Sequence, residues 1–149
     1  MYTSICVENI NNLGNLKKIF KESSKLPPEE SKKFLGITAG SSWVIPSEEG
    51  LFVLSIPDNG NTCYITASRA NPQLAEDNFL KLVTSNVRLG ISSKNIDFYA
   101  ETKNTGKIHS VGYIWIVEGS KEKILFALTT SEHEYASTQV IATVKIISN

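Results

Sequence analysis

The stretch that decides the fold is residues 106–147, GKIHSVGYIWIVEGSKEKILFALTTSEHEYASTQVIATVKII. It contains three successive apolar runs, at 107–118, 123–130 and 138–147, separated by short polar segments. Runs rich in β-branched and aromatic residues between turn residues are typical of consecutive strands. Strands joined by short turns pair antiparallel, so the sequence predicts an antiparallel sheet in this part of the chain.

The rest of the chain adds strands and helices in separate groups. Further strands are predicted at 41–46, 51–57, 62–68 and 95–103, and helices at 4–22, 28–35 and 72–84. The sequence lacks the regular alternation of strands and helices that is typical of parallel sheets. Strands and helices that occur in separate groups along the chain are typical of the α+β class. We therefore expect one α+β domain over residues 1–149. Its mostly antiparallel sheet of six to seven strands is flanked by the N-terminal helices and the helix 72–84.

The composition narrows the classes of partner. The chain has 149 residues, which fits one domain that folds without a metal or a disulfide. Its formal net charge is zero, so we expect no nucleic-acid binding, which requires surplus Lys and Arg. No apolar run approaches the ~20 residues of a membrane-spanning helix, so the protein is not expected to span a membrane. The first residues have no secretion signal, which fits either a cytosolic protein or a mature form.

The two cysteines, Cys6 and Cys63, lie far apart in the chain and form no CxxC motif. They fit two interpretations. In the first interpretation, both cysteines are unbonded and act as buried small hydrophobic residues, as is common in cytosolic proteins. Alternatively, they form a disulfide that joins the N-terminal helix to a strand, and closing so long a loop would contribute roughly 4 kcal/mol.

No catalytic motif, cofactor motif or metal-ligand spacing is present in the sequence, so we expect no catalytic residue, metal or cofactor. Whether the protein is an enzyme stays open, and the absence of motifs favours a non-enzyme. The two histidines are His109, in the middle of a strand, and His133, between two glutamates. A His flanked by Glu suits a metal ligand or an acid–base residue, but no partner at a metal-ligand spacing accompanies His133, which favours a solvated loop.

The strand 107–118 has faces of different character. The aliphatic side chains of Ile108, Ile114 and Ile116 lie on one face, which we expect to be core. The other face carries His109, Tyr113 and Trp115, and side chains of this amphipathic kind are common at interfaces. The neighbouring strand 95–103 adds Tyr99 to the same face. We therefore expect a binding surface that leaves at least one ring partly exposed, unless a helix covers it. Its predicted residues are Tyr99, His109, Tyr113 and Trp115.

Several short patterns resemble an uncharacterised family of small proteobacterial proteins, usually made with a secretion or lipoprotein signal. The main one is LFALTTSEHEYASTQVIATVKII together with VGYIWIVEG, including its Leu-Thr-Thr-Ser strand end at 128–131. An early helical Cys, a Trp strand before a Phe/Leu strand at 42–56, and a Thr-Cys strand followed by an Arg-Ala pair and a helix at 62–79 extend the resemblance. It implies a periplasmic setting, a lipid anchor before residue 1 as one option, and a Cys6–Cys63 disulfide. It implies no activity.

These observations lead to two functional hypotheses. The first is a non-enzymatic binding or interaction protein of the Gram-negative envelope, periplasmic or envelope-associated, with a protein partner. Inhibitors, immunity-type proteins and assembly accessory proteins belong to this class. The alternative is a small-molecule-binding protein or hydrolase with a pocket between the sheet and helix 72–84. A cytoplasmic location is the alternative to the periplasm.

Overall fold

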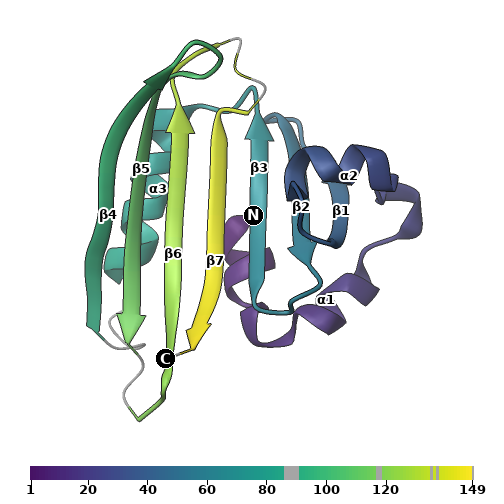
Figure 1. Ribbon diagram of the computed structural model, residues 1–149, viewed down its shortest axis with the longest axis horizontal. Coiled ribbons are helices and arrows are strands. Elements are labelled where there is room, and N and C mark those ends of the chain that lie inside the picture. Colours follow the sequence, from purple (N-terminus) through teal and green to yellow (C-terminus); the bar gives the residue numbers. More distant parts are fainter. Residues whose placement is uncertain (86–90, 117–118, 135, 137, 149) are drawn as a thin grey trace.

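The computed structural model describes residues 1–148 except 86–90, 117–118, 135 and 137, and shows one seven-stranded antiparallel sheet with helices on both sides (Figure 1). The strand order is β1-β2-β3-β7-β6-β5-β4. The predicted α+β class is therefore confirmed. The strands are β1 (Gly40–Ile45), β2 (Leu51–Pro57), β3 (Thr62–Ser68), β4 (Ile91–Thr102), β5 (Gly106–Ile116), β6 (Glu122–Ser131) and β7 (Val140–Ser148).

Two meanders make up this sheet. β1, β2 and β3 form the first, and β4 to β7 form the second. The last strand, β7, pairs with β3, so the end of the chain joins the two halves in the middle of the sheet. β2 is buried along most of its length, as its continuous apolar sequence predicted.

The N-terminal segment is a series of short helices. These are η1 (Thr3–Val7), η2 (Ile10–Asn12), α1 (Leu13–Ile19) and η3 (Glu22–Ser24). Gly14 within the apolar stripe of this segment predicts a break near residues 11–14, and the structure has one there, because the backbone of Asn12 is not helical where η2 ends and α1 begins. A further break at Asn9 separates η1 from η2. Cys6, Ile10, Leu13 and Leu16, whose spacing matches one side of a helix, are all buried.

The helix α2 (Pro28–Leu35) begins with a proline in its first turn, where no backbone N–H donor is needed. It ends at Gly36, whose φ of 62° suits a residue without a side chain. α2 packs on β1 and β2, and the hydroxyl of Tyr64 in β3 donates to the carbonyl of Phe34 at 2.8 Å. This contact places α2 on the side of the sheet to which Tyr64 points.

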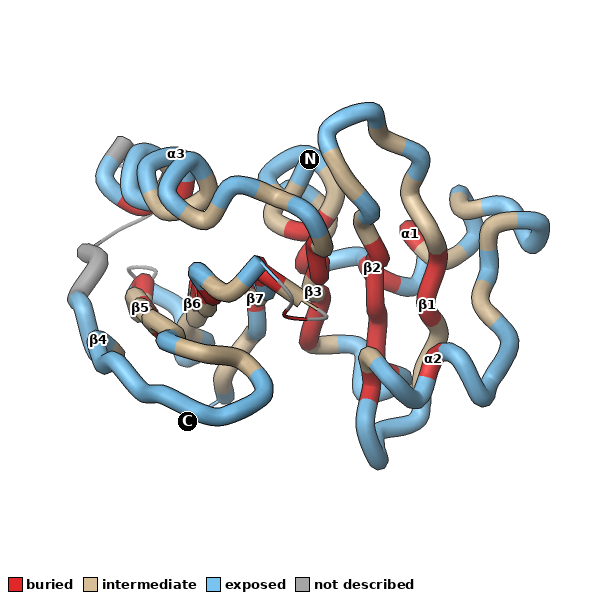
Figure 2. Tube along the Cα trace, turned by 90° about the horizontal axis from the view of Figure 1, so that it is seen from above, coloured by how far each residue is buried: buried red, intermediate tan, exposed pale blue. Residues whose placement is uncertain are grey.

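The helix α3 (Pro72–Ser85) covers the opposite side, which we call the helix face (Figure 2). Asn71 caps it by accepting from the backbone N–H of Leu74 at 3.1 Å. Phe79 and Val83 are buried, and the helix packs on β6. Seen along the sheet in Figure 2, α3 and the N-terminal helices share this side, whereas α2 lies on the other. We call the side of β4–β7 turned away from α3 the open face.

Candidate functional site

The four residues predicted to form a binding surface lie on one face of β4 and β5, as the alternation indicated. Tyr99 is directly opposite His109 in the sheet register, and Tyr113 and Trp115 follow on the same side of β5. This side is the helix face. Their burial differs widely, from 76% exposed at Tyr99 to 1% exposed at Trp115, with Tyr113 and His109 in between. Only Tyr99 and part of His109 and Tyr113 therefore reach the surface.

Trp115 and Tyr113 belong to the packing under α3. The rings of Trp115 and Phe126 have centroids 4.4 Å apart, and Tyr113 lies 6.2 Å from Phe79 of α3. The expectation that at least one of the two rings is partly exposed holds for Tyr113 alone. The helix covers the aromatic side of β5, so at these two positions this side is core and not a free surface.

The expectation that Ile108, Ile114 and Ile116 form the core is wrong. Ile116 is 47% exposed, and Ile108 and Ile114 are only half-buried. Alternation along a strand shows which residues share a face, but it does not show which face a distant helix covers. The helix places its own aromatic and aliphatic residues against the amphipathic rings and leaves the isoleucines outside.

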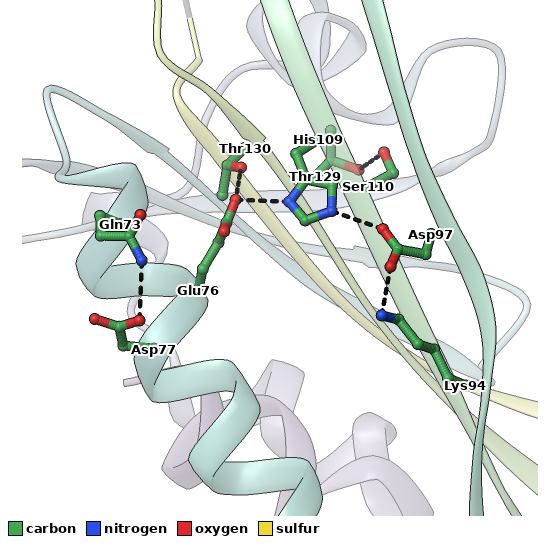
Figure 3. A network of polar contacts seen from close by, with 9 residues as sticks. All are labelled: Gln73, Glu76, Asp77, Lys94, Asp97, His109, Ser110, Thr129 and Thr130. Atoms are coloured by element: carbon green, nitrogen blue, oxygen red, sulfur yellow. Dashed lines mark hydrogen bonds and ion pairs between the residues drawn. The ribbon is translucent and has the colours of Figure 1, made fainter.

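His109 joins three elements through two carboxylates (Figure 3). Its Nδ1 lies 3.0 Å from a carboxylate oxygen of Glu76 in α3, and its Nε2 lies 2.8 Å from Asp97 in β4. Tyr99 stacks on the imidazole with ring centroids 4.2 Å apart and planes 3° apart. Lys94 pairs with Asp97. We call Glu76, His109 and Asp97 the histidine clamp.

The clamp favours the protonated imidazole. Burial alone would lower the pKa of His109, but hydrogen bonds with Asp97 and Glu76 outweigh it and raise that pKa above its ordinary value of 6.5. The hydrogen bonds from Lys94 and His109 hold the pKa of Asp97 below its ordinary value. A protonated imidazole donates from both nitrogens, so it satisfies both carboxylates at once.

This geometry suits a structural role, in which His109 holds α3 and β4 together, better than acid–base catalysis. A catalytic imidazole uses one nitrogen for its orienting partner and the other for the substrate or nucleophile. In the clamp both nitrogens lie within hydrogen-bond distance of carboxylates. Glu76 was missed by sequence reasoning, because it lies on a helix 33 residues before His109 and no local spacing connects the two.

A polar cleft of about 320 Å³ adjoins the clamp. Besides Glu76, Tyr99 and His109, its lining includes Lys107 and Glu132. Charges of both signs surround this cleft, so it has no preference for anions or cations. Among the residues that the structure describes, no group of three or more His, Cys, Asp or Glu side chains is arranged to hold a metal ion.

The loop histidine His133 is half-buried and packs against Gly106 at the β4–β5 turn. A Cβ atom at Gly106 would lie 2.9 Å from that side chain, and the φ of 64° there also favours glycine. His133 thus lies in a loop, as the sequence predicted, with Glu132 and Glu134 exposed on either side, but its own side chain is half-buried. Ser131, at the end of β6, is buried beside it, and its hydroxyl donates to the carbonyl of Thr105 at 2.5 Å.

Cys6 and Cys63 form a disulfide, with Cα atoms 5.5 Å apart and both residues fully buried. The bond joins η1 to β3 across a sequence separation of 57 residues. Of the two interpretations of the cysteines, the disulfide is the correct one. It fixes the N-terminal segment on the helix face.

The open face carries large apolar side chains without a cover. Phe98, Ile116 and Ile141 are 51%, 47% and 38% exposed and belong to β4, β5 and β7. One row across the strands links two of them, because Phe98 is opposite Ser110, Ser110 opposite Thr129, and Thr129 opposite Ile141. α2 packs on β1 and β2, and no described helix packs on this side of β4–β7 (Figure 2).

The charge on the open face has one sign. By the register of the sheet, Lys123 of β6 and Lys145 of β7 point to the same side as Ile116 and Leu125. Neither lysine has an ion-pair partner among the described residues. Apart from these two, the described side chains that β4–β7 turn to this side are aliphatic, aromatic, small or hydroxylic, with the amide of Asn95 at the register shift in β4.

The described part of the chain contains no helix that is long and apolar enough to cross a bilayer. Comparisons with protein-family models, with curated proteins and with solved structures gave no match for this chain. The resemblance to the envelope family therefore stays a prediction.

Proposed function

We propose that this protein is a non-enzymatic binding protein that docks a protein partner on the open face of β4–β7. The observation that carries the proposal is the set of large exposed apolar side chains on the side of β4–β7 that no described helix covers. An antiparallel sheet with one solvated face normally alternates apolar and polar residues. Here the outward side also carries large exposed apolar side chains, which are typical of interaction sites when they gather on one surface.

The partner that fits this face has an apolar surface with carboxylates at one end. Phe98, Ile116 and Ile141 would supply the desolvated centre of the interface. Lys123 and Lys145 add two positive charges, and no acidic side chain of the described residues balances them on this face, so the partner supplies the negative charge. The hydroxyls of Ser110 and Thr129 already form a hydrogen bond with each other at 2.8 Å. A partner that covers them therefore leaves neither hydroxyl without a hydrogen bond.

The buried Cys6–Cys63 disulfide supports an oxidising compartment for this binding. The envelope of a Gram-negative bacterium, which the sequence resemblance implies, is such a compartment. The histidine clamp supports the non-enzymatic part of the proposal, because both ring nitrogens are engaged within the fold.

Site-specific photocrosslinking in cells that naturally express the protein tests this proposal. A photoreactive phenylalanine analogue replaces Phe98, Ile116 or Ile141, one at a time. We expect a discrete adduct with one other protein from each of these positions. With that protein purified, Phe98→Asp should weaken its binding at least tenfold, and Lys123→Glu with Lys145→Glu should weaken binding most at low salt.

Two positions away from the open face serve as matched controls. Leu80 of α3 and Ile19 of α1 are 50% and 71% exposed apolar residues on other surfaces. The same analogue placed there should give no such adduct. Equal adducts from the control positions, no adduct from the open face, or adducts only with a second copy of this chain would each contradict the proposal.

A further inference from the structure

We infer that the protein has a binding site for a small apolar molecule, such as a single aromatic ring or a short alkyl chain, between η1, α3 and the sheet. This site lies on the helix face and is independent of the docking proposed for the open face. It is a cavity of about 230 Å³. An apolar cavity of about 150 Å³ in another protein is large enough to admit benzene, so this one has room for a ring with substituents.

The floor of the cavity is made of small and aliphatic side chains from three adjacent strands. Ile65 and Ala67 of β3, Val140 and Ala142 of β7, and Leu128 of β6 line it and are buried. The register places these residues side by side, since Ile65 is opposite Ala142 and Ala142 is opposite Leu128. The short side chains of Ala67 and Ala142 leave space above the middle of the sheet, because the neighbouring positions carry larger residues.

The walls come from two helical segments that do not meet over β7. Figure 2 shows α3 and the N-terminal end side by side above the sheet, with β7 beneath the space between them. Phe79 and Leu82 line the cavity on the α3 side, and Tyr2 lines it on the η1 side. Ala75 of α3 faces the cavity with a small side chain. The Cys6–Cys63 disulfide holds η1 at β3, so the N-terminal wall is fixed.

The lining determines the chemistry of the ligand. Among the residues that the structure describes, no Asp, Glu, Lys, Arg or His side chain lines the cavity. The Tyr2 hydroxyl donates to the carbonyl of Thr143 at 2.5 Å and is thereby used within the fold. Polar side chains occur at Thr3 and Asn78, both of which are exposed and mark the mouth. An uncharged apolar body in the cavity therefore leaves no buried group unpaired, whereas a charged molecule would lose its hydration without compensation.

Toluene is a suitable probe, because it is uncharged and of the right size. Added to the disulfide-bonded protein with labelled methyl groups, it should shift the methyl resonances of Val140, Leu128 and Leu82 in a saturable way. The same titration should raise the midpoint of thermal unfolding, because a ligand that binds only the folded state stabilises it. Methyl groups of Ile116 and Ile141 on the open face should show no saturable shift.

Ala142→Leu fills the cavity and should weaken toluene binding at least tenfold. The matched control is Ala127→Leu, the same substitution on the neighbouring strand, because Ala127 points to the open face. The control should bind toluene like the unchanged protein. Ala75→Leu fills the cavity from the helix side, and it replaces Ala142→Leu as the test if that variant fails to fold.

Saturable binding that is lost on filling and kept in the control supports the site. An absence of saturable shifts at the lining methyl groups would overturn it. Equal binding by the filled and control variants would overturn it too, since the toluene would then lie elsewhere. None of these outcomes depends on the photocrosslinking result, because the two sites lie on opposite faces of the sheet.

Discussion

Trp115 and Ile116 are neighbours in β5, yet the strand turns their side chains to opposite faces of the sheet. Trp115 is 1% exposed and lies against Phe126, whereas Ile116 is 47% exposed on the open face. Burial of apolar surface is the main favourable term in folding, so the two side chains contribute very different amounts to stability.

We expect Trp115→Ala to lower the free energy of unfolding by about 3–5 kcal/mol, the range of a fully buried aromatic residue. Ile116→Ala should lower it by about 1 kcal/mol or less, because much of that side chain is already in water. Urea unfolding of both variants measures the difference. A small loss for Trp115→Ala would mean that α3 does not cover this part of β5 in solution.

At the scale of elements, the histidine clamp connects α3 to β5 and β4. Glu76 also accepts a hydrogen bond from Thr130 of β6, so one helical carboxylate contacts two strands. The charged and titratable groups around His109 are Glu76, Asp97, Lys94 and Tyr99, with Lys107 and Glu132 lining the adjoining cleft. α3 is therefore tied to the sheet by a polar contact as well as by Phe79 and Val83.

This clamp predicts a pH-dependent stability. The pKa of His109 is raised in the folded state, so its stabilisation is fully present below the unfolded pKa of 6.5 and is lost as pH rises through the folded pKa. The lowered pKa of Asp97 gives stabilisation that is present above 3.8 and lost as pH falls through the folded pKa. The histidine clamp therefore stabilises the folded protein most between pH 3.8 and pH 6.5, the ordinary pKa values of Asp and His.

Urea unfolding from about pH 5 to about pH 9 measures the effect of the imidazole. We expect the unchanged protein to lose stability across this range and His109→Gln to lose less of it. His133→Gln is the control, because it removes the other histidine and leaves the clamp intact. The same pH dependence in His109→Gln as in the unchanged protein would contradict the role of His109.

At the scale of the whole molecule, two devices hold the layers together. β7 pairs with both β3 and β6 and so joins the two meanders, and the Cys6–Cys63 disulfide fastens the N-terminal segment to the middle of the sheet. The buried stripe of that segment, with Leu13 and Leu16, completes the core over the first meander.

We expect reduction of the disulfide to lower the free energy of unfolding by about 4 kcal/mol, because the unfolded chain then regains the freedom of a long loop. The double variant Cys6→Ala with Cys63→Ala should show a similar loss without added reductant. Urea unfolding with and without reductant measures it, and the double variant should be insensitive to reductant. A reduced protein as stable as the oxidised one would contradict this contribution.

The sequence by itself determined the strands, their antiparallel pairing and the stripe of the N-terminal segment. These features are local, since the alternation in β5 and the Asn-Pro start of α3 depend on neighbouring residues only. The same alternation correctly placed Tyr99, His109, Tyr113 and Trp115 on one face.

Only the tertiary structure decided which face is core. A strand such as β5, with Ile108, Ile114 and Ile116 on one side and Tyr113 and Trp115 on the other, has two apolar faces, and the packing of α3 far along the chain selects between them. The partners of His109 and the cavity beneath Ala75 likewise come from segments distant in sequence, so no local pattern carries them. Trp115 is buried and Tyr113 half-buried because α3 packs on the first face, whereas Ile116 is exposed because nothing in the described chain covers the second.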